Sequence, residues 1–174
     1  MPLEKNDILK LLDEKGIPYV NIDHPAVYNM DEMRRLGLPD TDRVAKNLFL
    51  KDDKKHYYLV TLKGDRRLSM KELRAVLGTR PLTFAKAEEL AGILGLIAGE
   101  VTPFGLLNDQ NRQVTMVFDT FFAGGKIGVH PVDNTASVYL AFGDLVRAVS
   151  ERAKEVVFLD RERMSRSHEP PREL

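Results

Sequence analysis

The chain contains no cysteine. Without thiols there is no disulfide framework, no cysteine nucleophile and no thiolate metal site. Long apolar runs are also missing, because the longest, residues 91–99, falls far short of the ~20 residues that cross a bilayer. The charged start, residues 1–10, lacks the apolar centre of a secretory signal. We therefore expect a cytoplasmic protein with no membrane partner.

Several common catalytic motifs are absent as well. The four histidines are scattered, and none stands at metal-ligand spacing from another His or a carboxylate, which argues against a metal site. There is neither a Walker loop nor a Gly-x-Gly-x-x-Gly motif, so no nucleotide cofactor is expected. No Gly-x-Ser-x-Gly elbow occurs, and Ser137 lies in a predicted strand without an evident base, which disfavours a Ser-His-Asp hydrolase. Glu88 and Glu89 are adjacent on a predicted helix, so their side chains would point to different faces. They are therefore weak candidates for a catalytic acid/base pair.

The charge balance is zero overall but uneven along the chain. Residues 46–86 carry eleven Lys or Arg and four Asp or Glu, an excess of seven positive charges that the rest of the chain offsets. A one-sided basic surface can attract a polyanion, whereas the alternative is a set of solvated helix faces and hairpin tips. Zero net charge argues against indiscriminate binding of nucleic acid.

The length of 174 residues, with 43% hydrophobic and 30% charged residues, indicates one globular domain. Helix signals interrupt strand signals irregularly, and we predict an α/β (α+β) fold with a mixed, largely antiparallel sheet flanked by helices. Predicted helices cover residues 6–15 (with Asn6 as N-cap), 29–37, 69–78, 86–95 and 143–153. Predicted strands cover residues 17–24, a hairpin over 45–63, and 113–123, 126–130, 135–142 and 155–160.

The strands at 113–123 and 126–130 are expected to form an antiparallel pair around a Gly124-Gly125 turn. We place the domain at residues 1–160 and expect a charged, mobile tail at residues 161–174.

Three polar features stand where predicted strands end. Lys46 begins an apolar strand, and it is either an exposed lysine or a cation aimed at a phosphate or carbonyl oxygen. His130 precedes Pro131, which favours an extended backbone, and it is either a half-buried structural histidine or part of a site. The loop "AGEVTPFGLLND" (98–109) is either a connector or a site built from backbone groups, with Glu100 and Thr102 as solvent-facing spacers.

Four segments, in this order and at these spacings, resemble the YbaK/prolyl-tRNA-synthetase-associated editing domain: "AKNLFLKD", "LTFA", "LGLIAGEVTPFGLLND" and "GVHPVDNTASV". The similarity covers about residues 5–160. It implies hydrolysis of the ester between a wrong amino acid and the terminal adenosine of tRNA. The likeness is greatest to free-standing members that deacylate alanine mischarged onto proline tRNA, with the neighbouring ribose hydroxyl assisting. Another mischarged tRNA such as Cys-tRNA(Pro), or a non-catalytic tRNA-binding module, stays open as an alternative.

The resemblance also implies roles for individual residues. The family's essential lysine falls on Lys46, and its Gly-x-x-x-Pro loop falls on Gly99 and Pro103, which makes these three the catalytic candidates. The expected partners are the acceptor end of proline tRNA and prolyl-tRNA synthetase, with no cofactor and no metal. Candidate substrate-binding residues are Asn47, Thr102, His130 and Asn134, and candidate tRNA-binding residues are Lys51 and Arg80.

Overall fold

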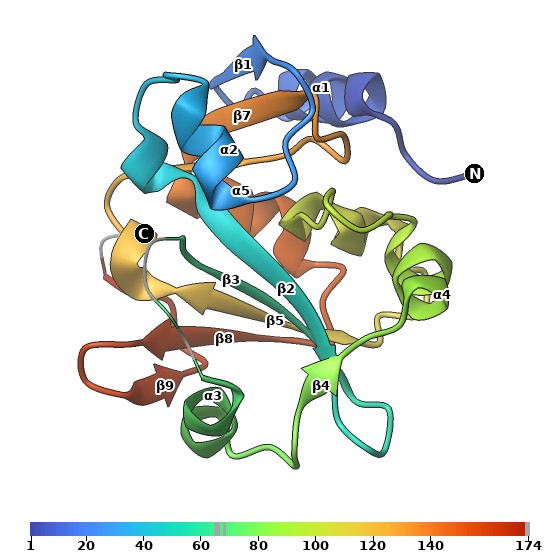
Figure 1. The fold of residues 1–174 in the computed structure, drawn as a ribbon, viewed down its shortest axis with the longest axis vertical. Helices are drawn as coiled ribbons and strands as arrows, with labels where there is room; N and C mark the ends of the chain where they lie inside the picture. The colour runs from blue at the N-terminus through green and yellow to red at the C-terminus, as the bar shows by residue number, and fades with distance from the viewer. Residues whose placement is uncertain (65–66, 68, 173–174) are drawn as a thin grey trace.

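The computed structural model describes residues 1–64, 67 and 69–172 of the chain. Its strands form a six-stranded sheet in the order β4-β2-β3-β5-β8-β9 and a three-stranded sheet in the order β1-β7-β6 (Figure 1). The strands of the larger sheet are β2 (Ala45–Lys51), β3 (Tyr57–Lys63), β4 (Thr83–Phe84), β5 (Val114–Asp119), β8 (Glu155–Asp160) and β9 (Ser165–Ser167). Those of the smaller sheet are β1 (Tyr19–Asp23), β6 (Lys126–Val129) and β7 (Ala136–Ala141). The predicted mixed α/β fold is confirmed.

The predicted hairpin at residues 45–63 is present as the antiparallel pair β2–β3. The expected antiparallel pair around Gly124-Gly125 is wrong, because β5 and β6 belong to different sheets. β5 instead pairs in parallel with β3 on one side and β8 on the other. All six of its residues are buried, as is usual for a central parallel strand covered on both faces.

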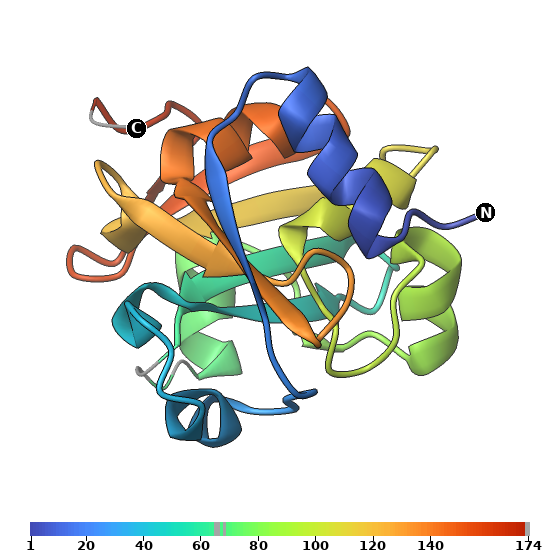
Figure 2. The same ribbon diagram turned by 90° about the horizontal axis from the view of Figure 1, so that it is seen from above.

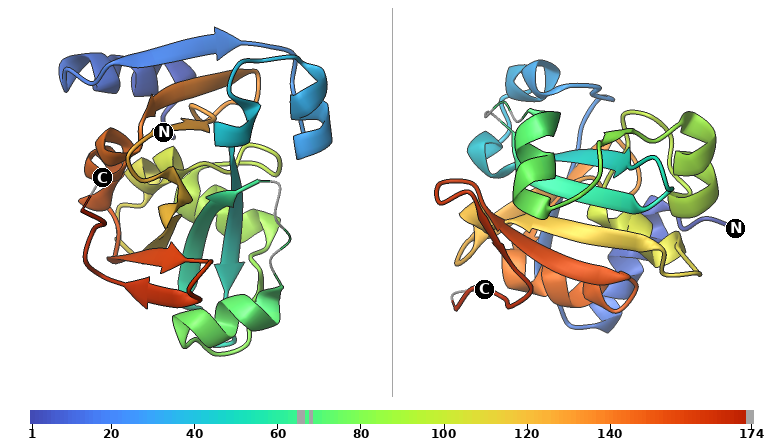
Figure 3. Two further views of the ribbon diagram at one scale, coloured as in Figure 1. Left: turned by 90° about the vertical axis from the view of Figure 1, so that its left-hand side faces the viewer. Right: turned by 90° about the horizontal axis from the view of Figure 1, so that it is seen from below.

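Alternate residues of β5 contribute to two cores. Met116 and Phe118 pack in the larger apolar cluster, which also receives Leu145 of α5 (Phe142–Ser150). Val117 packs in a second cluster with Leu73 of α3 (Met70–Leu77). Because neighbouring strand residues point to opposite faces, the two helices must cover opposite faces of the sheet, and Figure 3 shows this arrangement.

The helices begin and end at recognisable signals. Ser69 caps α3 by accepting a 3.0 Å hydrogen bond from the Glu72 amide, and Gly78 ends it with a φ of +66°. The expected Asn6 cap of the first helix is wrong, because the N-cap is Glu4, two residues earlier, which forms a capping box with Asp7. The helices are α1 (Lys5–Glu14), α2 (Met30–Arg35), α3 (Met70–Leu77), α4 (Ala87–Glu89) and α5 (Phe142–Ser150). Shorter turns are η1 (Thr41–Arg43), η2 (Leu90–Leu94, π-helical), η3 (Pro103–Asn108) and η4 (Thr120–Phe122).

The two ends of the chain pack against the domain. Ile8 and Leu12 of α1, four residues apart on one helix face, are buried in the core that also receives α5 (Figure 2). In the segment expected as a mobile tail, β9 pairs with β8, and the Arg161 guanidinium lies 3.7 Å from the Asp119 carboxylate. No helix among the described residues is long and apolar enough to span a membrane.

Candidate functional site

A cavity of about 480 Å³ opens where β2 begins. Part of its lining comes from the segment 27–34, which includes most of α2, and part comes from residues 45–47 of β2 and Val44 before them. The remaining lining comes from Gly64, Arg67, Gly99, Val101 and His130. The cavity therefore brings together four of the residues that the sequence singles out: Lys46, Asn47, Gly99 and His130.

Lys46 and Asn47 differ in how they are held. The Lys46 side chain is exposed, and no described carboxylate forms an ion pair with it. Asn47 is half-buried, and its Oδ1 accepts a 2.6 Å hydrogen bond from the Thr61 hydroxyl on the neighbouring strand. That bond leaves the Asn47 amide group as a donor at the cavity wall. The start of β2 thus contributes a cation and an N–H donor to the cavity lining, from opposite faces of the strand.

Gly99 lies at the cavity wall in a conformation that requires glycine. Its φ is +88°, and a Cβ placed there would lie 2.9 Å from Cδ1 of Tyr28. Pro103, four residues on, is buried at the start of η3 and does not line the cavity. Its part in the site is to fix the exit of the loop that carries Gly99.

The expectation that Glu100 and Thr102 face solvent is wrong. Thr102 is fully buried, and its hydroxyl donates a 2.6 Å hydrogen bond to the backbone carbonyl of His130. Glu100 is partly buried, and burial together with the charge of Asp133 raises the pKa of its carboxyl. Thr102 does not line the cavity, and it acts on the site through the position of His130.

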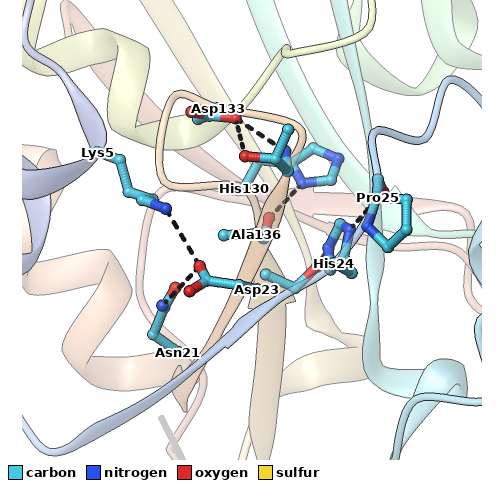
Figure 4. A network of polar contacts seen from close by, with 10 residues as sticks. Lys5, Asn21, Asp23, His24, Pro25, His130, Asp133 and Ala136 are labelled. Atoms are coloured by element: carbon cyan, nitrogen blue, oxygen red, sulfur yellow. Dashed lines mark hydrogen bonds and ion pairs between the residues drawn. The ribbon is translucent and has the colours of Figure 1, made fainter.

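The imidazole ring of His130 is also held by a hydrogen bond. Its Nδ1 lies 2.9 Å from the carbonyl oxygen of Ala136, and because a carbonyl only accepts, Nδ1 carries the proton (Figure 4). Burial, with a smaller contribution from the nearby charge of His24, lowers the pKa of His130. The ring is therefore neutral at pH 7, and Nε2 keeps a lone pair that can accept a hydrogen bond.

A second histidine lies behind the first. The ring centroids of His24 and His130 are 6.2 Å apart. The Nδ1 of His24 lies 2.9 Å from the Pro25 carbonyl and its Nε2 lies 2.8 Å from the Ser137 hydroxyl (Figure 4). By the same reasoning Nδ1 carries a proton, while the Ser137 hydroxyl can act as donor or acceptor toward Nε2. These bonds engage both nitrogens of His24 in holding β1 against β7.

Asn134 is buried outside the cavity lining. Its side-chain Nδ2 donates a 3.0 Å hydrogen bond to the carbonyl of Val27, and the Val27 amide donates a 3.4 Å bond to the carbonyl of Asn134. Val27 is a cavity-lining residue. Asn134 thus holds in place the part of the cavity lining that begins at Val27.

The two candidate tRNA-binding residues lie away from the cavity. Lys51 ends β2, five residues beyond Lys46 and so roughly 16 Å along the strand. It is half-buried, and its Nζ lies 2.6 Å from Oε1 of Glu89. Arg80 is exposed and forms a double hydrogen bond with Asp53, at 2.5 and 2.7 Å. Both cations therefore have carboxylate partners, whereas Lys46 has none among the described residues.

Glu89 is the centre of a small polar network at that end. Burial raises its pKa, but hydrogen bonds from Lys51 and Tyr57 more than compensate and hold the pKa at about 2. The same network and burial raise the pKa of Tyr57 to about 12. The network ties η2 and α4 to β2, so Glu89 has a structural role here.

Three cavity-lining residues were missed by sequence reasoning: Tyr28, Arg34 and Arg67. The predicted helix at 29–37 was the available signal, because its two arginines follow an aromatic residue. What the sequence could not supply was the packing of this helix over β2. A Cβ at Gly64 would lie 2.6 Å from Cε of Met30, so this glycine lets α2 approach the end of β3.

The described residues of the site offer charge and hydrogen bonds, and none of them is a serine, threonine or cysteine nucleophile. Lys46, Arg34 and Arg67 make the lining basic, and Asp31 is its one described acidic residue, paired with Arg34 at 2.7 Å. Among the described residues, no cluster of three or more His, Asp or Glu side chains could hold a metal ion. Such a site can bind an anionic group and polarise an ester that is already activated.

Comparison with known proteins gives one consistent result. The aminoacyl-tRNA editing domain family matches residues 24–148. The chain is 39% identical over 147 residues to the prolyl-tRNA editing protein ProX of Acetoanaerobium sticklandii, covering 83% of this chain and 90% of that protein. It is 34% identical over 158 residues to the prolyl-tRNA synthetase associated domain-containing protein 1 of Danio rerio, covering 89% and 86%.

A solved structure shares the fold. The crystal structure of a candidate trans-editing enzyme for prolyl-tRNA synthetase superimposes with a TM-score of 0.68 at 19% identity. The match covers 90% of this chain and 94% of that one.

Proposed function

The chain belongs to the aminoacyl-tRNA editing domain family, and from this premise we propose that it is a free-standing deacylase that hydrolyses mischarged proline tRNA. The ester joins a wrong amino acid, in our proposal alanine, to the terminal adenosine of tRNA(Pro). A free-standing editing protein meets its substrate after charging, so prolyl-tRNA synthetase is the proposed functional partner. The substrate is a tRNA end, and no cofactor is required.

The observation that carries the proposal is the convergence of Lys46, Asn47, Gly99 and His130 on one cavity. An aminoacyl ester needs no covalent catalyst, because its carbonyl is already activated toward water. The enzyme must hold the 3′ end, place a water molecule and stabilise the developing oxyanion. The cation of Lys46 and the amide group of Asn47 are suited to the oxygens of the ester and the sugar.

The described lining residues limit the candidates for a general base. They include no unpaired carboxylate, and in the neutral ring of His130 only Nε2 has a lone pair, since Nδ1 donates to the carbonyl of Ala136. We propose that the ribose hydroxyl next to the ester orients or activates the attacking water. Substrate assistance of this kind needs no unpaired carboxylate in the site, and it leaves Nε2 of His130 to accept a hydrogen bond.

Selection of alanine is proposed to rest on size. Val27, Val44 and Val101 provide an apolar lining near His130. An apolar pocket distinguishes groups by only ~1–3 kcal/mol per methylene, so attraction alone cannot favour alanine strongly. Exclusion of the larger proline side chain by the walls around His130 is therefore the proposed route to specificity.

The direct test uses purified protein and a panel of proline tRNAs charged with alanine, cysteine, serine or proline. We expect rapid release of alanine and little release of proline. Lys46→Ala should lower kcat/KM for Ala-tRNA(Pro) by about 10²-fold or more. Lys10→Ala is the matched control, because Lys10 is also an exposed lysine but lies on α1 outside the cavity.

Each outcome decides a different part of the proposal. Release of cysteine in preference to alanine would keep the deacylase and replace its substrate. Binding of the acceptor stem without release of any amino acid would show a non-catalytic tRNA-binding module. Equal activity of Lys46→Ala and Lys10→Ala would remove Lys46 from the mechanism.

A further inference from the structure

Tyr28 is an aromatic side chain left exposed at the cavity. Its exposed fraction is 67%, and among the described residues it is the one exposed large apolar side chain that also lines the cavity. Exposed aromatic surface beside a binding cavity is costly to leave in water and is typical of a contact surface for a ligand. The exposed ring is therefore suited to contact a ligand with a flat apolar face.

The position of Tyr28 is fixed from three directions. Its amide donates a 2.8 Å hydrogen bond to Oε2 of Glu32, and the Glu32 amide in turn donates to the N-cap side chain of Asn29. The preceding residue, Val27, is buried and tied to Asn134 by two hydrogen bonds. Since the backbone on both sides is held, the Cα–Cβ bond of Tyr28 keeps its direction relative to the cavity wall.

The ring itself rests on the loop that carries Gly99. A Cβ at Gly99 would lie 2.9 Å from Cδ1 and 3.4 Å from Cε1 of Tyr28. One edge of the ring is thus supported by the bare backbone of this loop, while two thirds of the side chain faces solvent. The arrangement is a supported aromatic platform beside Lys46 and His130.

We propose that Tyr28 is the stacking platform for the terminal adenine base of the tRNA substrate, an inference that rests on the proposed deacylase function. A base that stacks on Tyr28 places its ribose toward the interior of the cavity, where Lys46 and Asn47 can reach the ester. Arg34 and Arg67 line the same cavity and suit the backbone phosphates of the last nucleotides. Stacking is indifferent to the amino acid, so Tyr28 contributes affinity for the 3′ end and leaves selection of the amino acid to the inner wall.

The first experiment combines two enzymes, the wild type and Tyr28→Leu, with two substrates in a thermodynamic cycle. The substrates are alanylated acceptor-stem RNAs that end either in adenosine or in a ribose without its base. Loss of the base should lower kcat/KM of the wild type by about 5- to 150-fold, the usual effect of one base–aromatic stack. Tyr28→Leu should show the same reduction on the adenosine substrate and little further loss on the base-free substrate. Tyr28→Phe is the matched control and should behave as wild type on both.

The second experiment detects stacking of the terminal base directly and does not depend on catalysis. Uncharged acceptor-stem RNA carrying 2-aminopurine as its terminal base should lose fluorescence on binding to the wild type and to Tyr28→Phe, but not to Tyr28→Leu. The assignment of Tyr28 would be overturned if removal of the base and Tyr28→Leu lowered kcat/KM independently, so that the two losses multiply when combined. Equal quenching by all three proteins would overturn it as well. If the wild type hydrolyses neither alanyl ester, the deacylase function is wrong, and the quenching experiment still decides the platform by itself.

Discussion

The side-chain hydroxyl of Thr102 donates a 2.6 Å hydrogen bond to the backbone carbonyl of His130. Thr102 belongs to the loop that begins at Gly99, and His130 directly follows β6, so this bond joins two walls of the cavity. Thr102 is fully buried, which excludes water as a substitute partner for its hydroxyl. The bond therefore sets the distance between the Gly99 loop and the histidine.

Thr102→Val is expected to lower the free energy of unfolding by about 1–3 kcal/mol, because the volume is kept while a buried carbonyl loses its donor. With His130 released, discrimination between alanyl and bulkier aminoacyl esters should also weaken. Denaturant unfolding and deacylation of a tRNA panel measure the two effects. Thr102→Ser, which keeps the hydroxyl, should retain both stability and selectivity, and a valine variant as stable as wild type would contradict the role of this bond.

Gly99→Ala is expected to lower stability by about 1–2 kcal/mol, because its φ of +88° is strained for any residue with a Cβ. The added methyl also meets Tyr28, so deacylation should fall together with stability. Gly92→Ala is the matched control: nothing lies within 4 Å of its Cβ position, in the π-helical turn η2. That substitution should leave activity unchanged and stabilise by about 0.5–1 kcal/mol. Comparable losses in the two variants would disprove a specific contact at Gly99.

Much of the architecture could be predicted from local patterns. The β2–β3 hairpin and the ends of α3 follow from signals within a few residues, such as Ser69 and Gly78. The placement of β5 could not be predicted in this way. A mainly apolar strand such as β5 fits either an antiparallel or a parallel neighbour, and its pairing with β3 and β8 is decided by long crossovers.

The residues of the candidate site were likewise predicted only in part. Motif resemblance found Lys46, Asn47, Gly99 and His130, and the cavity contains all four. It did not separate residues that line the cavity from those that support it, since a supporting residue such as Asn134 follows the lining residues closely in sequence. Tyr28 was missed because its importance depends on contact with Gly99, which lies far away in the chain.

Glu89 is expected to make stability depend on pH in the acid range. Its pKa in the folded protein, about 2, lies below the usual value of 4.5. A lowered pKa means that the unfolded chain binds the proton more tightly, so the stabilisation is complete above pH 4.5 and is lost as the pH falls toward 2. Glu89→Gln should remove this part of the pH dependence, as measured by unfolding at a series of pH values. An identical acid profile for wild type and Glu89→Gln would show that the network with Lys51 and Tyr57 contributes nothing.

Arg80 is expected to exchange its carboxylate partner for a tRNA phosphate. Its pair with Asp53 is exposed, and exposed ion pairs contribute little to stability, so giving up this partner costs little. Arg80→Gln should weaken tRNA binding and reduce the slope of log Kd against log salt by about 1, with hydrolysis of a small alanyl ester unchanged. Equal loss on tRNA and on the small ester would assign Arg80 to the structure of the domain. Arg147→Gln, an exposed arginine paired with Asp144 on α5, is the control and should change neither.

His130 is expected to remain neutral throughout the physiological range. Burial, the largest influence, and the charge of His24 lower its pKa from 6.5, while its hydrogen bond to Ala136 and the charge of Asp133 act in the opposite direction. Because the folded pKa is the lower one, the contribution of the neutral ring to stability is complete above pH 6.5 and is lost as the pH falls below it. Proton NMR of the ring should therefore show a midpoint below 6.5, and deacylation should lose activity only on the acid side of that midpoint. His24→Gln should raise the midpoint slightly without reaching 6.5, since burial remains. A midpoint above 6.5 in the wild type would mean that the ring enters the reaction as a cation, and the acceptor role of Nε2 would have to be abandoned.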